Sequence, residues 1–142
     1  MCSLNIPSIP KNLQYFKDTV INNPRIKFNV IGLSEVRLDP NLISLYELPG
    51  YNMFANSRNI HGGDVVLYVS DDHNATIVNH LNISEAFIET TGVQANTGKG
   101  KYLFLNVYRP PSGRFAYFYD VLSDILSSVY DRKYQSVYNK SH

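Results

Sequence analysis

The apolar residues of this chain fall into short runs separated by turn residues, a pattern typical of strands. The clearest run is FNVIGLS at 28–34, in which Phe28, Val30, Ile31 and Leu33 are apolar and which Glu35 follows directly. A run this short and this apolar predicts a strand covered on both faces of a sheet. Further strands are predicted at 2–6, 51–57, 64–70, 75–83, 86–95 and 101–108.

Two stretches have helical spacing instead. Leu13, Phe16 and Val20 predict a helix that begins near Pro10 and ends at 22–24. A second amphipathic helix follows Pro110 and Pro111, with apolar positions at Phe115, Phe118, Leu122, Ile125, Leu126 and Val129.

The remaining segments complete the predicted order of elements. Residues 36–50 predict a loop with one helical turn, and QSVY at 135–138 predicts the start of another buried strand. The sequence therefore predicts a single α/β (α+β) layered domain over residues 1–142, built on a mixed sheet.

Composition narrows the class of protein. The chain has 142 residues, of which 44% are hydrophobic, enough for one domain with its own core. Thirteen Lys and Arg against twelve Asp and Glu give a net charge of +1. This lacks the basic excess of a dedicated nucleic-acid binder, but it permits an enzyme that meets nucleic acid at a local site.

Cysteine usage and hydropathy argue against disulfide-linked, zinc-binding, secreted and membrane-spanning proteins. With one cysteine, Cys2, the chain cannot form an internal disulfide or a Cys-based zinc site, and we expect Cys2 to be buried rather than nucleophilic. No signal-peptide pattern and no apolar run of about eighteen residues are present. We therefore expect an intracellular chain with no membrane partner, and the choice between nucleus and cytoplasm stays open.

Glu35 is the first candidate for chemistry. The carboxyl ends of strands in α/β sheets face the usual ligand crevice, and Mg²⁺ is held by one or two carboxylates together with substrate phosphates. Glu35 is therefore a candidate metal ligand. The alternative, an ordinary solvated loop carboxylate, stays open on the residues alone.

Four segments occur in a fixed order: SLNIPSIPKNLQYF (3–16), FNVIGLSEVRL (28–38), GGDVVLYVSD (62–71) and LNVYRPPSGRFAYFYDVLSDIL (105–126). Together they resemble the N-terminal portion of the endonuclease domain of non-LTR (LINE-type) retrotransposons. That domain belongs to the endonuclease/exonuclease/phosphatase superfamily, with the apurinic endonucleases and the DNase I-like enzymes. The resemblance implies a four-layered α/β sandwich of the DNase I-like type and Mg²⁺-dependent hydrolysis of phosphodiester bonds in DNA.

The resemblance also implies roles for three residues. Asn5 matches an Asn that helps to bind the phosphate and orients a catalytic carboxylate. Glu35 matches the metal ligand, and Tyr108 matches a Tyr that contacts the scissile phosphate. Arg109 and Arg114 lie close to Tyr108 in the sequence and are our predicted substrate contacts, with ordinary surface charge as the alternative.

Other side chains are assigned structural roles. We expect Tyr117 and Tyr119 to pack rather than to stack on bases. The segment Ser70-Asp71-Asp72-His73 is interpreted as a hairpin turn and not as a catalytic motif, because Asp and Asn are common turn residues.

The sequence departs from the family after the second helix. The family continues with a Gly-Asp-x-Asn motif and a Ser-Asp-His motif, which have no counterpart in QSVYNKSH (135–142) or elsewhere in the chain. We therefore expect a C-terminally truncated, inactive endonuclease fragment, with a non-catalytic DNA- or protein-binding remnant as the alternative. We also expect one sheet to be largely missing. VIGL (30–33), VVLYV (65–69) and LFLNV (103–107) would then be partly uncovered, which predicts self-association.

Overall fold

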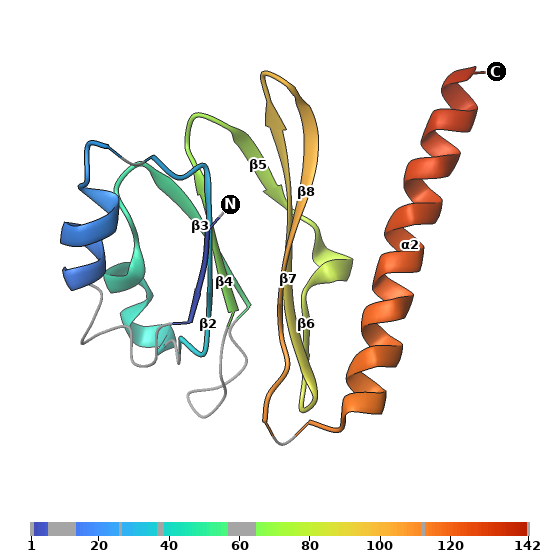
Figure 1. Cartoon of the computed structure of the whole chain (residues 1–142), viewed down its shortest axis with the longest axis horizontal. Coiled ribbons are helices and arrows are strands. Elements are labelled where there is room, and N and C mark those ends of the chain that lie inside the picture. The colour runs from blue at the N-terminus through green and yellow to red at the C-terminus, as the bar shows by residue number, and fades with distance from the viewer. Residues whose placement is uncertain are drawn as a thin grey trace.

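The computed structural model describes residues 2–5, 14–25, 27–36, 39–56, 65–111 and 113–141. They form two four-stranded sheets that face each other, with a long helix beyond the second sheet (Figure 1). Sheet A has the order β1-β2-β4-β3, from β1 (Cys2–Asn5), β2 (Val30–Ser34), β4 (Val65–Ser70) and β3 (Tyr51–Asn56). Sheet B has β7 (Ile88–Thr97) at its centre, paired with β5 (Asn74–Ile77), β6 (Ile83–Glu85) and β8 (Gly100–Tyr108).

Sheet A is mixed, as predicted. β1 runs parallel to β2, whereas β2, β4 and β3 are antiparallel neighbours. All pairs in sheet B are antiparallel. The chain is therefore a mixed α/β structure, in agreement with the predicted class.

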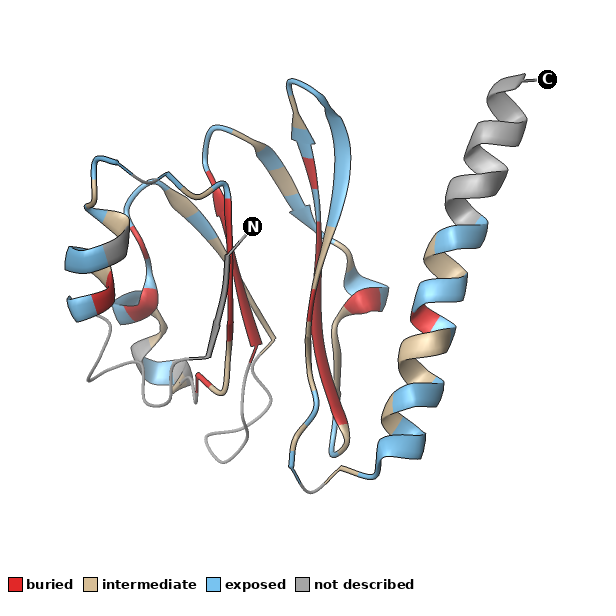
Figure 2. Cartoon of the chain, in the orientation of Figure 1, coloured by how far each residue is buried: buried red, intermediate tan, exposed pale blue. Residues whose placement is uncertain are grey.

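The interface between the sheets is apolar. Val30, Leu67 and Val69 of sheet A meet Val93 and Ala95 of sheet B in one buried cluster. Figure 2 shows the buried residues concentrated on the facing strands. Because the inner faces exclude water over this whole cluster, burial of apolar area holds the two sheets together.

The outer face of sheet A is covered as well. Phe16 and Tyr46 pack against Leu33 and Val66 in a second buried cluster. Tyr46 belongs to η2, a 3₁₀ helix (Pro40–Tyr46) that is longer than the single turn predicted. Tyr68 also lies in this cluster, where burial raises the pKa of its hydroxyl well above the usual range. β2 and β4 are thus covered on both faces, as their apolar runs predict.

The expectation that one sheet is largely missing is wrong. VIGL (30–33) and VVLYV (65–69) are fully buried, because sheet B covers one face of these strands and the cluster with Phe16 and Tyr46 covers the other. LFLNV (103–107) is more open, with Leu103 39% exposed. Neither β2 nor β4 therefore has an exposed face through which two copies of the chain could associate.

The strand predicted over 75–83 is also wrong as one element. It divides into β5, a 3₁₀ turn η3 (Asn79–Leu81) and β6. Leu81 lies directly over Gly92 of β7, where an added Cβ would be 2.5 Å from the Leu81 Cβ. Thr90 fixes the turn, since its Oγ1 donates a hydrogen bond of 2.6 Å to the Leu81 carbonyl.

Both predicted helices are present among the described residues, and the second is longer than predicted. Residues 14–16 and η1 (Lys17–Ile21) are helical and stop at Asn22, as predicted, whereas the predicted start near Pro10 lies outside the described residues. The last helix, α2 (Phe115–Ser141), continues through 135–138, so the strand predicted there is wrong. The sequence from 115 to 141 contains no Gly or Pro to end a helix. No described helix is long and apolar enough to cross a membrane.

Candidate active site at one end of the two-sheet core

The ends of β1, β2 and β8 meet at one end of the core, the lower end in Figure 1, which we call the Glu35 end. Asn5 pairs in register with Ser34, so the Asn5 backbone lies beside the residue that precedes Glu35. Tyr108 is the last residue of β8 and reaches Glu35 from the opposite sheet. The structure thus brings all three predicted catalytic positions together, although the Asn5 side chain is outside the described part.

Glu35 has an unusual backbone conformation. Its φ of +58° is the only positive φ of a non-glycine residue in the described part of the chain. Leu33 and Val36 on either side of it are buried in the same apolar cluster. Leu33 and Val36 are three residues apart, so in a continuous extended strand their side chains would point to opposite faces. The left-handed conformation of Glu35 reverses this alternation, and both side chains therefore reach the same apolar cluster. Strained residues of this kind concentrate at functional sites.

The Glu35 carboxylate contacts a tyrosine from the other sheet. The Tyr108 hydroxyl donates a hydrogen bond to Glu35 Oε1, and both residues are half-buried. A carboxylate offers about four acceptor positions, so it can accept this bond and also coordinate a cation. The contact therefore orients the Glu35 carboxylate.

The Asn106 side chain fixes the position of β8 relative to sheet A. Its buried side-chain amide donates to the carbonyls of Leu33 at 2.9 Å and Val66 at 3.1 Å. An added Cβ on Gly32 would lie 3.4 Å from this amide, so Gly32 provides the space for it. The position of Tyr108, two residues further along β8, follows from this anchor. We did not identify Asn106 from the sequence, although an Asn inside the apolar run LFLNVY is a usable signal.

Glu89 is a second carboxylate at this end that we did not identify from the sequence. It pairs in register with Tyr108 and is only 7% exposed. It shares its strand face with Thr91, whose hydroxyl bonds the Val65 carbonyl of sheet A at 3.4 Å. Glu89 therefore lies on the inner face of sheet B beside Tyr108. Nowhere in the described part of the chain do three or more His, Cys, Asp or Glu side chains group as a metal site.

The two arginines lie on the surface just beyond Tyr108. Arg109 Nη1 donates to the Gly113 carbonyl at 3.3 Å, and its guanidinium lies 5.9 Å from the centre of the Phe115 ring. The Arg114 guanidinium lies 5.9 Å from the Tyr117 ring. The expected packing role is wrong for Tyr119, which is 59% exposed, and incomplete for Tyr117, which contacts Phe87 but stays 52% exposed.

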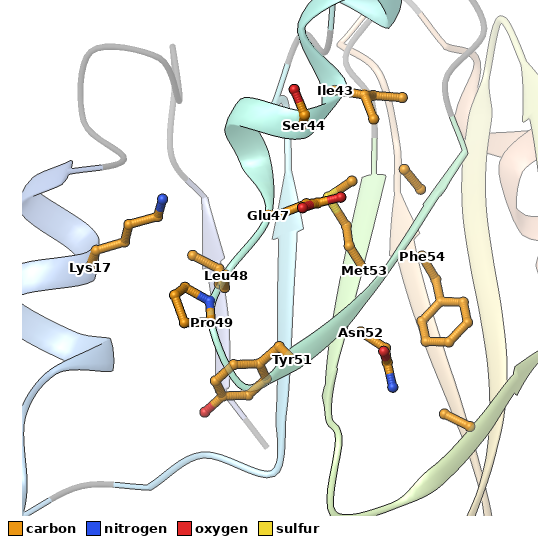
Figure 3. Close-up of a pocket in the computed structure, with 12 residues that line it drawn as sticks. Lys17, Ile43, Ser44, Glu47, Leu48, Pro49, Tyr51, Asn52, Met53 and Phe54 are labelled. Atoms are coloured by element: carbon orange, nitrogen blue, oxygen red, sulfur yellow. The ribbon is translucent and has the colours of Figure 1, made fainter.

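A separate hollow lies away from this end. It has a volume of about 1080 Å³ beside β3 and is lined by Lys17, Glu47, Tyr51 and Met53 among others (Figure 3). Glu35 and Tyr108 are not among its lining residues. Its walls come mainly from η2 and β3, and it offers one carboxylate and one amine without a contact between them.

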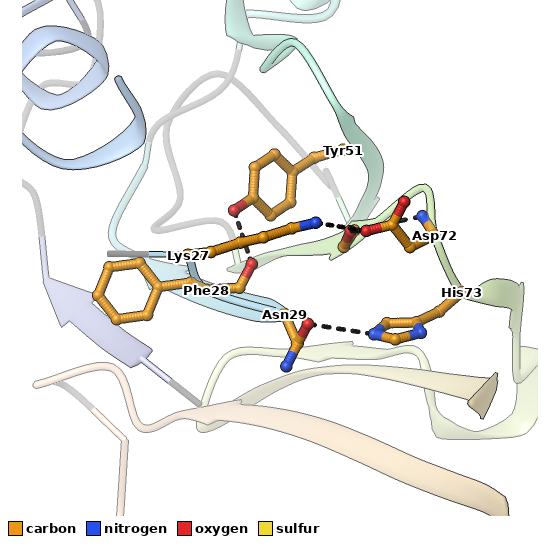
Figure 4. Close-up of polar contacts among 7 residues, drawn as sticks. Lys27, Phe28, Asn29, Tyr51, Asp72 and His73 are labelled. Carbon is orange, nitrogen blue, oxygen red and sulfur yellow. Dashed lines mark hydrogen bonds and ion pairs between the residues drawn. The ribbon is translucent and has the colours of Figure 1, made fainter. Parts of the chain in front are cut away.

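A polar network occupies the opposite end of the core, which we call the Lys27 end (Figure 4). Lys27 Nζ and Asp72 Oδ2 are 2.5 Å apart, and His73 Nε2 lies 3.3 Å from Asn29 Oδ1. The hydrogen bond and charge of Lys27 lower the pKa of Asp72, and those of Asp72 raise the pKa of Lys27. The His73 amide bonds the Ser70 carbonyl at 3.0 Å, which confirms that 70–73 is a turn.

Comparison of the chain with protein-family models gives no match, and comparison with curated proteins gives none either.

Proposed function

We propose that the Glu35 end is the cation- and phosphate-binding part of a Mg²⁺-dependent endonuclease site that acts on DNA. The domain would be a member of the LINE-type endonuclease group with a DNase I-like sandwich. One observation carries this proposal: Glu35, held in a left-handed conformation at a strand end, receives a hydrogen bond from Tyr108 of the facing sheet. The two residues are 73 positions apart in the sequence.

The residues fit a magnesium ion. Mg²⁺ prefers hard oxygen ligands and keeps several waters, so one or two protein carboxylates and substrate phosphates are enough to hold it. Glu35 would provide the carboxylate. A bound Mg²⁺ supplies polarisation of a phosphoryl oxygen and stabilisation of the leaving oxyanion.

The protein's own residues orient the reacting groups. Tyr108 holds the Glu35 carboxylate in place, because its one hydroxyl proton is donated to Glu35 Oε1. Arg109 and Arg114 provide positive charge next to this position. Such preorganised donors stabilise charge that develops in the transition state.

None of the described residues is assigned the role of activating water. General base catalysis contributes roughly 10²–10⁴-fold. We therefore expect these 142 residues by themselves to bind metal and DNA but to cleave DNA poorly. A non-catalytic DNA-binding module is the second candidate, and it is favoured by the exposed arginines, which lie on the surface beside aromatic rings.

Plasmid nicking and DNA binding test the proposal together. Supercoiled plasmid and a short labelled duplex would be incubated with the protein in Mg²⁺ or EDTA, beside Glu35→Ala and the control Asp72→Ala. Nicking that needs Mg²⁺ and Glu35 would establish an endonuclease. DNA binding that needs both, without nicking, would establish the binding part of the site. If Mg²⁺ and Glu35 affect neither readout, the proposal is wrong.

A further inference from the structure

The start of α2 lies at the lower end of Figure 1, which is the Glu35 end of the core, and exposed aromatic rings gather on this first part of the helix. Phe115 is 63% exposed and Tyr119 is 59% exposed, and their ring centres are 6.2 Å apart. Large rings at this level of exposure are unusual on a monomer surface when they form one patch. This patch, defined by Phe115 and Tyr119, is a candidate interaction surface.

Positive charge accompanies the rings. Arg109 lies 5.9 Å from the Phe115 ring, and Arg114 lies 5.9 Å from the ring of Tyr117, which is two residues after Phe115. Alternation of aromatic faces with arginines is the arrangement that binds single strands, in which bases stack on rings and arginines follow the phosphates. Duplex DNA offers no such contact, because its bases stack on one another.

The patch has a fixed position relative to Tyr108. Arg109 follows Tyr108 directly, and its side chain bonds the Gly113 carbonyl. Gly113 lies against Phe87 so closely that an added Cβ would be 2.7 Å from the Phe87 Cα. The Gly113 amide also bonds the Pro110 carbonyl at 2.9 Å. These contacts hold the loop after Tyr108 against the turn between β6 and β7, so the rings are positioned and not merely exposed.

We propose that Phe115 and Tyr119, with Arg109 and Arg114, form a stacking platform for unpaired nucleotides of a DNA strand. The platform would deliver the adjacent phosphate toward Glu35 and Tyr108, so the substrate class is DNA with an unpaired segment. This inference rests on the proposed function for the identity of the ligand. A second copy of the chain is a poorer occupant, because a two-fold contact through this patch would bring like-charged arginines together.

The test is DNA binding in EDTA, where no cleavage occurs. The probe is a labelled oligodeoxythymidylate of about 12 nucleotides, a length within the range that single-strand binders cover. We expect it to bind more tightly than a duplex of equal length. Phe115→Ala and Tyr119→Ala should each weaken binding about 5- to 100-fold. Tyr15→Ala is the matched control, because Tyr15 is 73% exposed but lies before η1, across sheet A from α2.

The arginines give an independent readout. Each phosphate contact on a single strand contributes about 0.7 to the slope of log affinity against log salt. Arg109→Gln and Arg114→Gln should each reduce that slope by about this amount. Circular dichroism melts would confirm that the variants fold, which their exposed positions favour.

Two outcomes would overturn the platform. One is equal or tighter binding of duplex, and the other is ring variants that bind oligodeoxythymidylate like wild type. Ring variants that change the sedimentation of the protein but not its DNA binding would assign the patch to a second copy instead. If the wild-type protein binds oligodeoxythymidylate through the two rings, but neither nicking nor duplex binding depends on Mg²⁺ and Glu35, only the proposed function is contradicted. Mg²⁺- and Glu35-dependent nicking without single-strand preference contradicts only the platform.

Discussion

The two ends of the core hold similar chemistry in very different settings. At the Glu35 end, a carboxylate, a tyrosine and a buried Asn connect the two sheets, and one residue is held in a left-handed conformation. At the Lys27 end, the ion pair is exposed, with Lys27 and Asp72 side chains 70% and 58% accessible. Exposed ion pairs contribute little to stability and place few constraints on geometry. The candidate site therefore differs from the Lys27 end because its side chains are held in fixed positions, and not because it contains charged groups.

Removing the Asn106 anchor should have the largest effect. Asn106→Leu keeps the volume similar but leaves the buried carbonyls of Leu33 and Val66 without this donor. We expect the free energy of unfolding to fall by about 3 kcal/mol, measured by urea denaturation. Asn29→Ala, which removes the His73 contact at the Lys27 end, should cost less than about 0.5 kcal/mol. Equal losses for the two variants would remove the distinction between the ends.

The strain at Glu35 can be measured with a matched pair of variants. Glu35→Ala and Glu35→Gly both remove the carboxylate, but only glycine adopts a φ of +58° without a steric cost. We therefore expect Glu35→Gly to be more stable than Glu35→Ala by about 1 kcal/mol, the cost of a left-handed residue. A thermal or urea unfolding series would measure the difference. If the alanine variant is equally or more stable, Glu35 is not strained.

Tyr108→Phe isolates one hydrogen bond. The ring stays in place, while the donor to Glu35 Oε1 is lost. We expect a loss of about 1 kcal/mol in the free energy of unfolding, together with weaker Mn²⁺ binding because the carboxylate is less well oriented. Tyr51→Phe serves as a control, since the Tyr51 hydroxyl bonds the Phe28 carbonyl at 2.7 Å without touching Glu35. Mn²⁺ binding that falls equally in both variants would argue against a specific role for Tyr108.

The smallest effect concerns pH at the Lys27 end. Lys27 lowers the pKa of Asp72 in the folded state, so the pair's contribution is present above the ordinary Asp pKa. That contribution is lost as the pH falls through the lowered pKa. NMR titration of the Asp72 carboxyl should show its pKa rising toward the ordinary value in Lys27→Met. An unchanged pKa would mean that the ion pair does not persist in solution.

Most strands follow from the sequence because their apolar runs end at turn residues. The observed β3, β4, β7 and β8 start and end within two residues of the predicted runs. What the runs cannot specify is which sheet a strand joins, because burial of a strand looks the same in either sheet. The expectation that one sheet is missing came instead from the family's C-terminal motifs, which have no counterpart here, although the chain supplies both sheets.

The remaining differences also have local causes. The break in 75–83 depends on Leu81 of η3 meeting Gly92 of β7, and a contact between residues this far apart in the sequence leaves no local pattern. For the site, the resemblance singled out Glu35 and Tyr108, whereas Glu89 and Asn106 did not stand out. Their importance depends on strand register, which places Glu89 opposite Tyr108 and Asn106 against sheet A.

The central claim is that a divalent cation binds at the Glu35 end. The most direct test is a titration of the ¹⁵N-labelled protein with Mn²⁺, which broadens the NMR signals of nearby amides. We predict broadening first at residues around Glu35 and Tyr108, and its loss in Glu35→Ala. Broadening centred on Asp71 and Asp72 instead, unchanged by Glu35→Ala, would contradict the account.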